Sequence, residues 1–399
     1  MSKPRIAFVT NIIPPYRKTF YEKLCATPGF DWLVVRGSTA VEDGRPDYRG
    51  AIAIPERAVR NARLRLGPYL VRWQSGALAA VRAFRPQVLV VLGIPGTLSN
   101  WCLCAWARAA GVKVIAWASG FEPQRAGGLA WRLKRILARR YYAMADRCLV
   151  YGTKGAAHLE ELGVPQARIE VCYNGIEIDA LELEESAIRA EAARVRRREG
   201  AESRRIFLYV GGMLEEKRVD LLLRAYGRIR RDEDGWVLWL VGDGPARPGL
   251  EALARDLGLP DVRFFGRIID GVDAYFAAAD VFVLPGLGGL AFNQAMFWGT
   301  PCVGGEADGT EDDLVVDGVT GRRFTPGDLD SLVAAMRACT RTPAEELARW
   351  GERGRALVTS RSNVSEMVRT FVAAISGLTP RSDPDLAGLR SLHPGRPRR

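Results

Sequence analysis

The chain has 399 residues, of which 48% are hydrophobic and 26% charged, and its formal net charge is +11. That length is too great for one ordinary hydrophobic core and predicts two domains of roughly 150–200 residues each. The composition excludes a disordered or membrane-spanning chain, because no apolar run reaches the roughly 18–20 residues that cross a bilayer. No signal peptide precedes the first apolar segment, and the seven cysteines suit reduced thiols, so we expect a cytoplasmic protein.

The positive charge is concentrated in the first half of the chain. Residues 1–180 contain 26 Lys and Arg against 13 Asp and Glu, whereas the remainder is slightly acidic. Two stretches, residues 57–72 and 131–147, hold much of the excess. Apolar residues interleave with the second stretch, as in helices that lie on an anionic membrane surface. These apolar residues are Leu129, Trp131, Leu133, Ile136 and Leu137. This favours peripheral attachment to the inner face of a membrane; the alternative is a solvated basic face over an ordinary core stripe.

Short apolar runs alternate with helical segments along both halves. In the first half we expect strands at residues 5–11, 31–37, 87–93, 112–119, 148–152 and 169–174. In the second half we expect them at residues 206–211, 236–242, 262–266, 281–284 and 301–304. Most runs are continuous rather than alternating, which is typical of parallel strands buried on both faces. The fold class is therefore α/β, with two doubly wound, Rossmann-like parallel-sheet domains facing a cleft.

The remaining segments read as helices and a tail. Residues 181–205 suit a surface helix plus connector, and further helices are expected near 328–339, 344–358 and 363–376. Asp328 is a suitable N-cap for the first of these three.

The most informative stretch is residues 284–303. A short strand runs into a turn that contains Gly286, Gly288 and Gly289, and a helix then begins near Leu290. A helix start after a glycine turn points unpaired backbone N–H groups at an anion, so this segment predicts a phosphate or diphosphate site. The alternative is a tight connection whose glycines serve only the turn.

Three further motifs lie at strand ends. Residues 210–220 follow a strand and open a helix with Lys217 at its start, a natural clamp for a diphosphate. Residues 240–245 form a second glycine turn, and Asn174-Gly175 closes the first half with a turn-forming pair. Each motif is weak alone, but the set in this order is specific.

Together these motifs resemble the glycosyltransferases of the GT-B fold, specifically the large retaining family 4 that uses nucleotide-sugar donors. The resemblance extends over residues 5–378. Its carriers are Asn174-Gly175, Gly211, Glu216-Lys217, Asp220, residues 241–245, Phe265-Gly266, Pro285, Gly289-Leu290, Ala295-Met296, residues 299–301, Glu311, Asp317-Gly318 and Gly321.

The resemblance implies a domain plan. Residues 1–178 would form the acceptor-side domain, 179–204 a connector helix and 205–358 the donor domain. Residues 359–378 would return to the N-terminal domain, followed by a disordered tail over 379–399.

The resemblance also implies the site. Lys217 would act as the catalytic residue that stabilises the leaving diphosphate, while a phosphate oxygen accepts the proton of the acceptor. The implied donor-binding residues are Gly211, Gly212, Lys217, Arg218, Gly242, Gly244, Gly288, Gly289, Leu290, Asn293 and Gln294.

The chain departs from the family pattern at charged positions. Two glutamates eight positions apart are replaced by Gly286 and Gln294, and an arginine by Gly212. An amide at 294 can still bond a ribose diol. Arg218 is the candidate substitute for the missing arginine.

On the acceptor side, a histidine often found in the family is replaced by Ser119, and Glu122 follows as a candidate to orient a hydroxyl. In the loop after the first strand, two prolines would aim Tyr16 and Arg17 at an acceptor, with Pro15 in contact. The alternatives are a rigid cap on the following helix and, for Glu122, a merely solvated carboxylate.

We therefore expect retaining transfer from a nucleotide-sugar to a glycan or lipid-linked glycan, in the synthesis of a surface polysaccharide or glycoconjugate. The alternative is a catalytically inactive scaffold or partner protein of the same fold. No metal site and no cofactor are expected, because the sequence contains only two histidines and no zinc or phosphate-loop motif. Nucleic acid is not an expected partner, because no known nucleic-acid module is visible.

Overall fold

The computed structural model describes residues 3–38, 41–42, 45–66, 69–120, 128–233, 235–306 and 309–379. The chain divides into two compact units, Met1–Tyr173 with Val364–Arg399, and Asn174–Asn363. The segment predicted as a connector helix belongs to the second unit. Apart from Thr379, the predicted tail lies outside the described residues.

The first unit is built on an eight-stranded sheet with the order β10-β9-β8-β7-β1-β2-β5-β6. Its neighbouring strands run parallel except for β5 and β6. The central strands are buried on both faces, which explains their continuous apolar runs. The strands are β1 (Arg5–Thr10), β2 (Asp31–Ser38), β5 (Glu56–Leu66), β6 (Tyr69–Ser75), β7 (Val88–Leu92), β8 (Lys113–Ala118), β9 (Arg147–Val150) and β10 (Ile169–Val171); β3 (Val41–Glu42) and β4 (Arg45–Pro46) form a separate ribbon.

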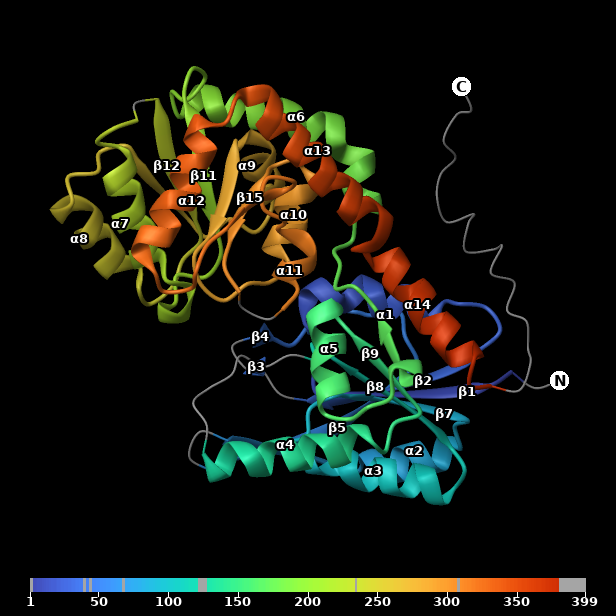
Figure 1. The fold of residues 1–399 in the computed structure, drawn as a ribbon. Helices are drawn as coiled ribbons and strands as arrows, with labels where there is room; N and C mark the ends of the chain where they lie inside the picture. Colours follow the sequence, from blue (N-terminus) through green and yellow to red (C-terminus); the bar gives the residue numbers. More distant parts are fainter. Residues whose placement is uncertain are drawn as a thin grey trace. The chain divides into compact units, whose positions relative to one another are not determined.

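Helices cover both faces of this sheet (Figure 1). One face packs on α1 and α14 around an aromatic cluster that includes Phe8, Phe20, Trp117 and Phe371. The other face packs on α2 and α3. The helical segments are η1 (Pro15–Arg17), α1 (Lys18–Cys25), α2 (Ala77–Phe84), α3 (Leu98–Ala109), α4 (Leu129–Tyr142), α5 (Thr153–Glu161), η2 (Gln166–Arg168) and α14 (Val364–Ser376).

The antiparallel pair β5–β6 was not predicted. Its register pairs Arg60 with Ser75 and Arg63 with Arg72, so the first basic stretch forms a β-hairpin. Most side chains of β5 are exposed on both faces, apart from Val59. The strand therefore lacks the run of buried apolar residues that predicts the other strands.

The second unit has a six-stranded parallel sheet with the order β13-β12-β11-β14-β15-β16. The short basic strand β16 was also missed. The strands are β11 (Arg205–Val210), β12 (Trp236–Val241), β13 (Val262–Gly266), β14 (Val281–Leu284), β15 (Cys302–Gly304) and β16 (Gly321–Arg323).

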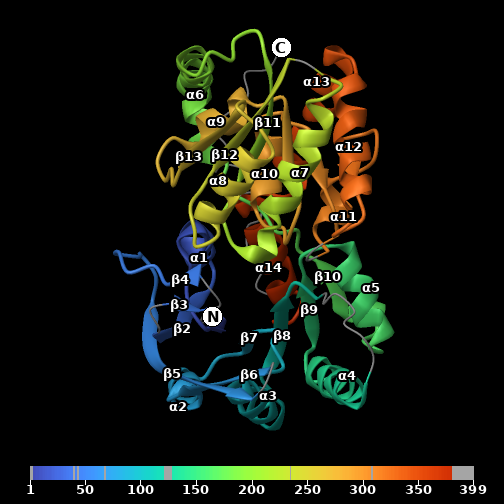
Figure 2. The ribbon, with the colours of Figure 1, turned by 90° about the vertical axis from the view of Figure 1, so that its left-hand side faces the viewer.

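Figure 2 shows α6 and α9 on one face of the second sheet and α7 and α12 on the other. The predicted N-cap is confirmed, because the Asp328 carboxylate accepts from the backbone N–H groups of Asp330 and Ser331. The helical segments are α6 (Asp179–Arg198), η3 (Glu215–Lys217), α7 (Val219–Ile229), α8 (Arg247–Asp256), α9 (Val272–Ala278), α10 (Ala291–Phe297), α11 (Glu311–Leu314), α12 (Leu329–Arg341) and α13 (Ala344–Arg361). The prediction of two doubly wound parallel-sheet domains is confirmed.

Candidate donor site and acceptor-side residues

The glycine turn after β14 lies directly against the turn η3, which is 70 residues away in the sequence. The N–H of Leu287 donates to the carbonyl of Glu216 at 3.1 Å. Nζ of Lys217 donates to the carbonyls of Leu287 and Gly288 at 2.6 and 3.3 Å. The two motifs predicted to clamp a diphosphate therefore form one structure in the second unit, with the Lys217 ammonium held at the turn.

Gly286 is the point of closest contact between the two motifs. A Cβ atom there would lie 2.2 Å from the carbonyl oxygen of Glu216 and 2.5 and 2.6 Å from backbone atoms of Lys217. The clash is with backbone, so no side chain fits without moving η3. A glutamate at 286 would therefore require η3 to move away from the turn.

The start of α10 follows the same turn. Gly289 has φ 152°, and Leu290 is the N-cap with no side-chain capping bond. Within the part of the chain that the structure describes, the N–H groups of Gly289, Leu290 and Ala291 have no hydrogen-bond acceptor. This is the arrangement that the sequence predicted for binding an anion.

A buried carboxylate lies against the turn. Glu311 on α11 is fully buried, and its Oε2 accepts from the N–H of Gly309 at 3.0 Å. A Cβ at Gly288 would approach Oε1 of Glu311 to 2.1 Å, so a side chain at 288 requires the Glu311 carboxylate to move. Glu311 was recognised in the sequence as part of the family pattern, but no role was assigned to it.

The glycines after β11 and β12 let two strand-end turns approach each other. A Cβ at Gly242, where φ is 141°, would lie 1.8 Å from the carbonyl oxygen of Gly211. A Cβ at Gly244 would lie 2.4 Å from the carbonyl oxygen of Met213. Gly212 differs, because a Cβ there would meet nothing closer than 3.7 Å. A side chain therefore has room at 212, whereas it has none at 242 or 244.

The polar side chains of α10 are engaged within the second unit. Asn293 is 2% exposed and donates to the carbonyl of Asn174 at 3.1 Å, so it holds the Asn-Gly turn rather than facing a ligand. Nε2 of Gln294 donates to Oδ1 of Asp273 at 2.9 Å, and Nε1 of Trp298 donates to the same oxygen at 2.7 Å. The amide of Gln294 thus donates to a carboxylate on α9.

Arg218 is not placed as a second diphosphate cation. Its Nε and Nη2 donate to the two carboxylate oxygens of Asp220 at 3.1 and 3.2 Å. This hydrogen-bonded pair raises the pKa of Arg218. The expectation that Arg218 replaces the missing arginine is therefore not supported by the geometry.

The side chains of the loop after β1 differ in how far they are exposed to solvent. Pro15 begins η1, and Tyr16 is 45% exposed. Arg17 is only 5% exposed, and its guanidinium carbon lies 5.2 and 5.6 Å from the ring centres of Trp117 and Tyr151. Arg17 is therefore held among aromatic rings in the interior, where it lines, with Tyr16, a cavity of about 110 Å³.

Of the remaining acceptor-side residues, Ser119 directly follows β8 and lines a larger cavity of the first unit. Glu122 lies outside the described residues.

The ranges that the structure describes contain no cluster of three His, Cys, Asp or Glu side chains suited to a metal ion. None of their helices combines the length and the hydropathy needed to cross a bilayer.

Two family models match the chain. The model for glycosyl transferases group 1 matches residues 204–342, and that for the glycosyl transferase 4-like domain matches residues 24–175. The chain is 30% identical over 349 residues to the GDP-mannose-dependent alpha-(1-6)-phosphatidylinositol monomannoside mannosyltransferase of Mycolicibacterium smegmatis, covering 82% of this chain and 87% of the relative. The enzyme of the same name from Mycobacterium tuberculosis is 31% identical over 364 residues, covering 84% and 90%. The chain belongs to the family 4 glycosyltransferases.

Solved structures agree on the GT-B fold. An Anabaena protein in complex with UDP has a TM-score of 0.70 at 16% identity, covering 94% of this chain and 100% of that one. Sucrose-phosphate synthase from Thermosynechococcus elongatus has a TM-score of 0.69 at 19% identity, covering 94% and 99%. These likenesses and the family assignment confirm the expected fold and a nucleotide-sugar-dependent hexosyltransferase.

The structure gives physical contacts at the two positions where the sequence departs from the expected glutamate pattern. At 286 the family's glutamate is replaced by contact with the backbone of η3. At 294 the glutamine is bonded to Asp273, which sequence reasoning missed because its partner lies 21 residues further along the chain. Lys217 is the cation that the structure places on the glycine turn.

Proposed function

We propose that this glycosyltransferase moves mannose, with retention of anomeric configuration, from GDP-mannose to a glycan or lipid-linked glycan in the synthesis of a surface polysaccharide or glycoconjugate. The observation that carries the donor site is the bond from Lys217 Nζ to the Leu287 carbonyl beside the uncapped helix start. The choice of donor is supported by the two mannosyltransferases that match more than four-fifths of the chain. Those relatives are named as mannosyltransferases, so they give no support to an inactive scaffold.

The proposed chemistry needs few protein groups. The bond between the sugar C1 and the diphosphate oxygen breaks while C1 bonds to the acceptor oxygen on the same face. The acceptor's proton passes to an oxygen of the leaving phosphate. Lys217 and the N–H groups of Gly289 and Leu290 stabilise the charge that develops there, and one such donor is typically worth about 3–4 kcal/mol. Because these groups carry the charge, we propose that the reaction needs no metal and that EDTA leaves the rate unchanged.

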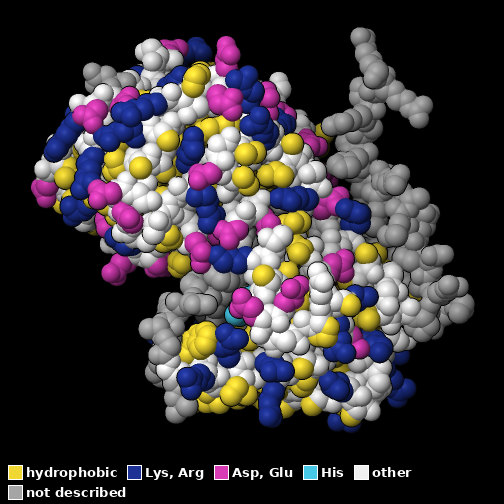
Figure 3. Space-filling model, in the orientation of Figure 1, with side chains coloured by type: hydrophobic (Ala, Val, Ile, Leu, Met, Phe, Trp, Pro, Cys, Tyr) yellow, Lys and Arg dark blue, Asp and Glu magenta, His cyan; other side chains and the backbone are white. Residues whose placement is uncertain are grey.

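Surface chemistry of the first unit supports a lipid-linked acceptor. Helix α4 exposes Leu133 and Ile136 to 56% and 52% between exposed basic side chains. The β5–β6 hairpin exposes Leu64 and Trp73 beside its arginines. Figure 3 shows Lys and Arg side chains with hydrophobic ones among them on the unit that contains α4. Two such elements suit adsorption to an anionic membrane surface.

Calorimetry with UDP, GDP and dTDP, each with and without an attached sugar, tests the donor site. We expect GDP and GDP-mannose to bind wild type, and Lys217→Ala to weaken binding roughly 10- to 100-fold, because a charged hydrogen bond is worth about 1.5–3 kcal/mol. Arg218→Ala is the matched control, since that cation is already paired with Asp220. Absence of nucleotide binding in wild type would contradict the proposal. NMR of the product's anomeric carbon tests retention.

Sedimentation with anionic and neutral vesicles tests the membrane surface. The double variant Leu133→Ser/Ile136→Ser is expected to lose binding to anionic vesicles. Leu183→Ser is the control, because Leu183 is also exposed but lies on α6 of the second unit. Equal binding by all three proteins would contradict a role for α4.

A further inference from the structure

The two faces of strand β6 differ in chemistry. Side chains alternate along a strand, so Arg72 and Gln74 lie on one face and Trp73 on the other. Arg72 and Gln74 are 7% and 3% exposed, whereas Trp73 is 44% exposed. Polar side chains are buried in proteins where they have hydrogen-bond partners. The partners of this buried polar face therefore show what the hairpin holds in place.

Gln74 bonds to the end of β1 and to an asparagine directly across the hairpin. Asn61 and Gln74 are opposite each other in the register, and Nε2 of Gln74 donates to Oδ1 of Asn61 at 3.2 Å. The same Nε2 donates to the carbonyl of Thr10 at 3.0 Å. Nδ2 of Asn61 donates to the carbonyl of Asn11 at 2.9 Å. The two amides thus bond two consecutive carbonyls at the point where β1 ends.

Glycine at position 37 makes room for the Asn61 amide. Gly37 lies on β2 and is paired with Val59 of β5. A Cβ at Gly37 would lie 2.1 Å from Oδ1 and 2.3 Å from Nδ2 of Asn61. The φ angle of Gly37 is not positive, so an alanine there conflicts with the amide and not with the backbone conformation. The place of the Asn61 amide is therefore set by three strands.

The bonded carbonyls open the loop that forms much of the smaller cavity of the first unit, of about 110 Å³. Strands β7 and β8 end at the same cavity, which Leu92 and Trp117 line. From the end of β1 and the loop after it, the lining residues are Thr10, Asn11, Ile12, Pro14, Tyr16 and Arg17. The conformation of this loop therefore decides the shape of the cavity and the places of Tyr16 and Arg17.

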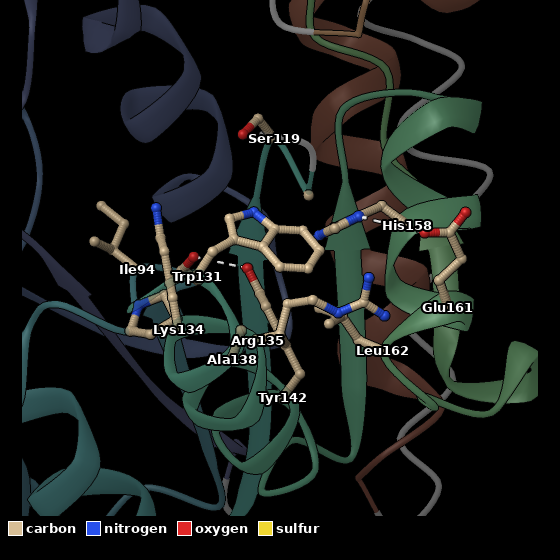
Figure 4. A pocket seen from close by; sticks show the side chains of 13 residues that line it. Ile94, Ser119, Trp131, Lys134, Arg135, Ala138, Tyr142, His158, Glu161 and Leu162 are labelled. Carbon is tan, nitrogen blue, oxygen red and sulfur yellow. Dashed lines mark hydrogen bonds and ion pairs between the residues drawn. The ribbon is translucent and has the colours of Figure 1, made fainter. Parts of the chain in front are cut away.

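The hairpin also holds the loop after β7. The N–H of Arg72 donates to the carbonyl of Gly96 at 2.9 Å, and Arg72 forms a parallel bridge with Thr97. Ile94 of this loop lines both cavities of the first unit, and Figure 4 shows it in the larger one. Strands β1 and β7 are neighbours where the strand order reverses, and ligands of open α/β sheets bind at such a point.

We propose that Asn61 and Gln74 are positioning residues for the acceptor, because they hold residues 10–17 in the conformation that forms the smaller cavity. The inference rests on the proposed function, since it concerns the acceptor side of that reaction. The two amides act through the loop and do not touch the reacting atoms. A side chain of similar volume without the N–H donor should release the loop and leave the packing of the hairpin in place.

Hydrogen exchange measured by mass spectrometry tests the positioning without any acceptor. Gln74→Met keeps the volume of the side chain and removes its amide, and Gly37→Ala displaces the amide of Asn61. In both variants the backbone N–H groups of residues 10–17 are expected to exchange roughly tenfold faster than in wild type. Residues 284–298 of the donor side should exchange at the wild-type rate. Ser75→Ala is the matched control, because Ser75 follows Gln74 on β6 and is exposed.

Steady-state kinetics separate positioning from a general loss of structure. The acceptor probe is octyl α-D-mannopyranoside, and the donor is GDP-mannose. Gln74→Met is expected to raise the KM for the glycoside roughly tenfold and to leave the KM for GDP-mannose and its hydrolysis by water unchanged. Asn61→Ala should behave alike. Adding Gly37→Ala to Asn61→Ala should change little further, because the alanine at 37 acts by displacing that amide.

The outcomes decide this proposal separately from the proposed function. Wild-type exchange of residues 10–17 in both Gln74→Met and Gly37→Ala would overturn it. A rise in the KM of donor and acceptor alike would also overturn it, because that result shows a general loss of structure. If wild type binds GDP and does not use the glycoside, the exchange measurement decides alone. A wild type that binds no GDP contradicts the proposed function and leaves the exchange result to be read by itself.

Discussion

Gly286→Ala is the substitution that best tests how the donor side is assembled. The new methyl group would overlap the backbone of Glu216 and Lys217 at 2.2–2.6 Å, so η3 must move away from the glycine turn. Overpacking of this kind typically costs about 1–3 kcal/mol. Each kcal/mol lowers the melting temperature of a domain of this size by about 2–4 °C. We therefore expect a lower melting temperature in a thermal unfolding scan.

The same displacement should weaken donor binding. Lys217 Nζ is held at 2.6 Å from the Leu287 carbonyl, and moving η3 takes the ammonium away from the helix start. Loss of a charged hydrogen bond predicts a Kd for the nucleotide diphosphate that rises roughly 10- to 100-fold. Calorimetry with GDP measures this change.

Gly212→Ala is the matched control for Gly286→Ala. It adds the same methyl group to the other glycine that departs from the family pattern, where nothing lies within 3.7 Å. Its stability should change by no more than about 0.5 kcal/mol. If Gly286→Ala weakens GDP binding by displacing Lys217, the double variant Gly286→Ala/Lys217→Ala should bind GDP about as weakly as Lys217→Ala alone. A Gly286→Ala protein with wild-type melting temperature and affinity would refute the reasoning.

Three further predictions concern single contacts. Gly212→Arg restores a cation where a side chain fits, and calorimetry should show GDP binding tighter by roughly tenfold. Gln294→Glu sets a carboxylate against Asp273, so its melting temperature should fall, and adding Asp273→Asn should recover it. Glu185 is bonded to Arg355, which lowers the pKa of that carboxyl to about 2. Glu185→Gln should therefore cost about 1–2 kcal/mol at pH 7, and the difference from wild type in urea unfolding should shrink as the pH falls from about 4.5 toward 2.

Much of the fold can be predicted from the sequence, because most of its strands are buried on both faces. Segments such as β7 and β12 are continuous apolar runs, and such runs are typical of buried parallel strands. The hairpin β5–β6 cannot be predicted in this way, because most side chains of β5 are exposed and β6 buries the polar Arg72 and Gln74 instead of an apolar run. Which residues of β5 and β6 face each other depends on contacts between the two strands, and no local sequence pattern shows this.

The candidate site also contains some features that the sequence predicts and others that it does not. The glycine turn and Lys217 were found because glycine and lysine after a strand carry a local meaning. The contact of Gly286 with η3 and the bond from Gln294 to Asp273 were not found, because each joins residues distant in the sequence. The burial of Arg17 among aromatic rings is of the same kind. Side-chain partners of this sort come from tertiary packing alone.

The replacements of the two glutamates of the family pattern are consistent with one another in physical terms. A glutamate at 286 would require η3 to withdraw, and with it the ammonium of Lys217. A glutamate at 294 would face the carboxylate of Asp273, whereas a glutamine donates to it. Glycine at 286 and glutamine at 294 are thus the residues that this packing accepts. It follows that restoring either glutamate alone should impair the protein, because the first would displace η3 and the second would set two carboxylates against each other.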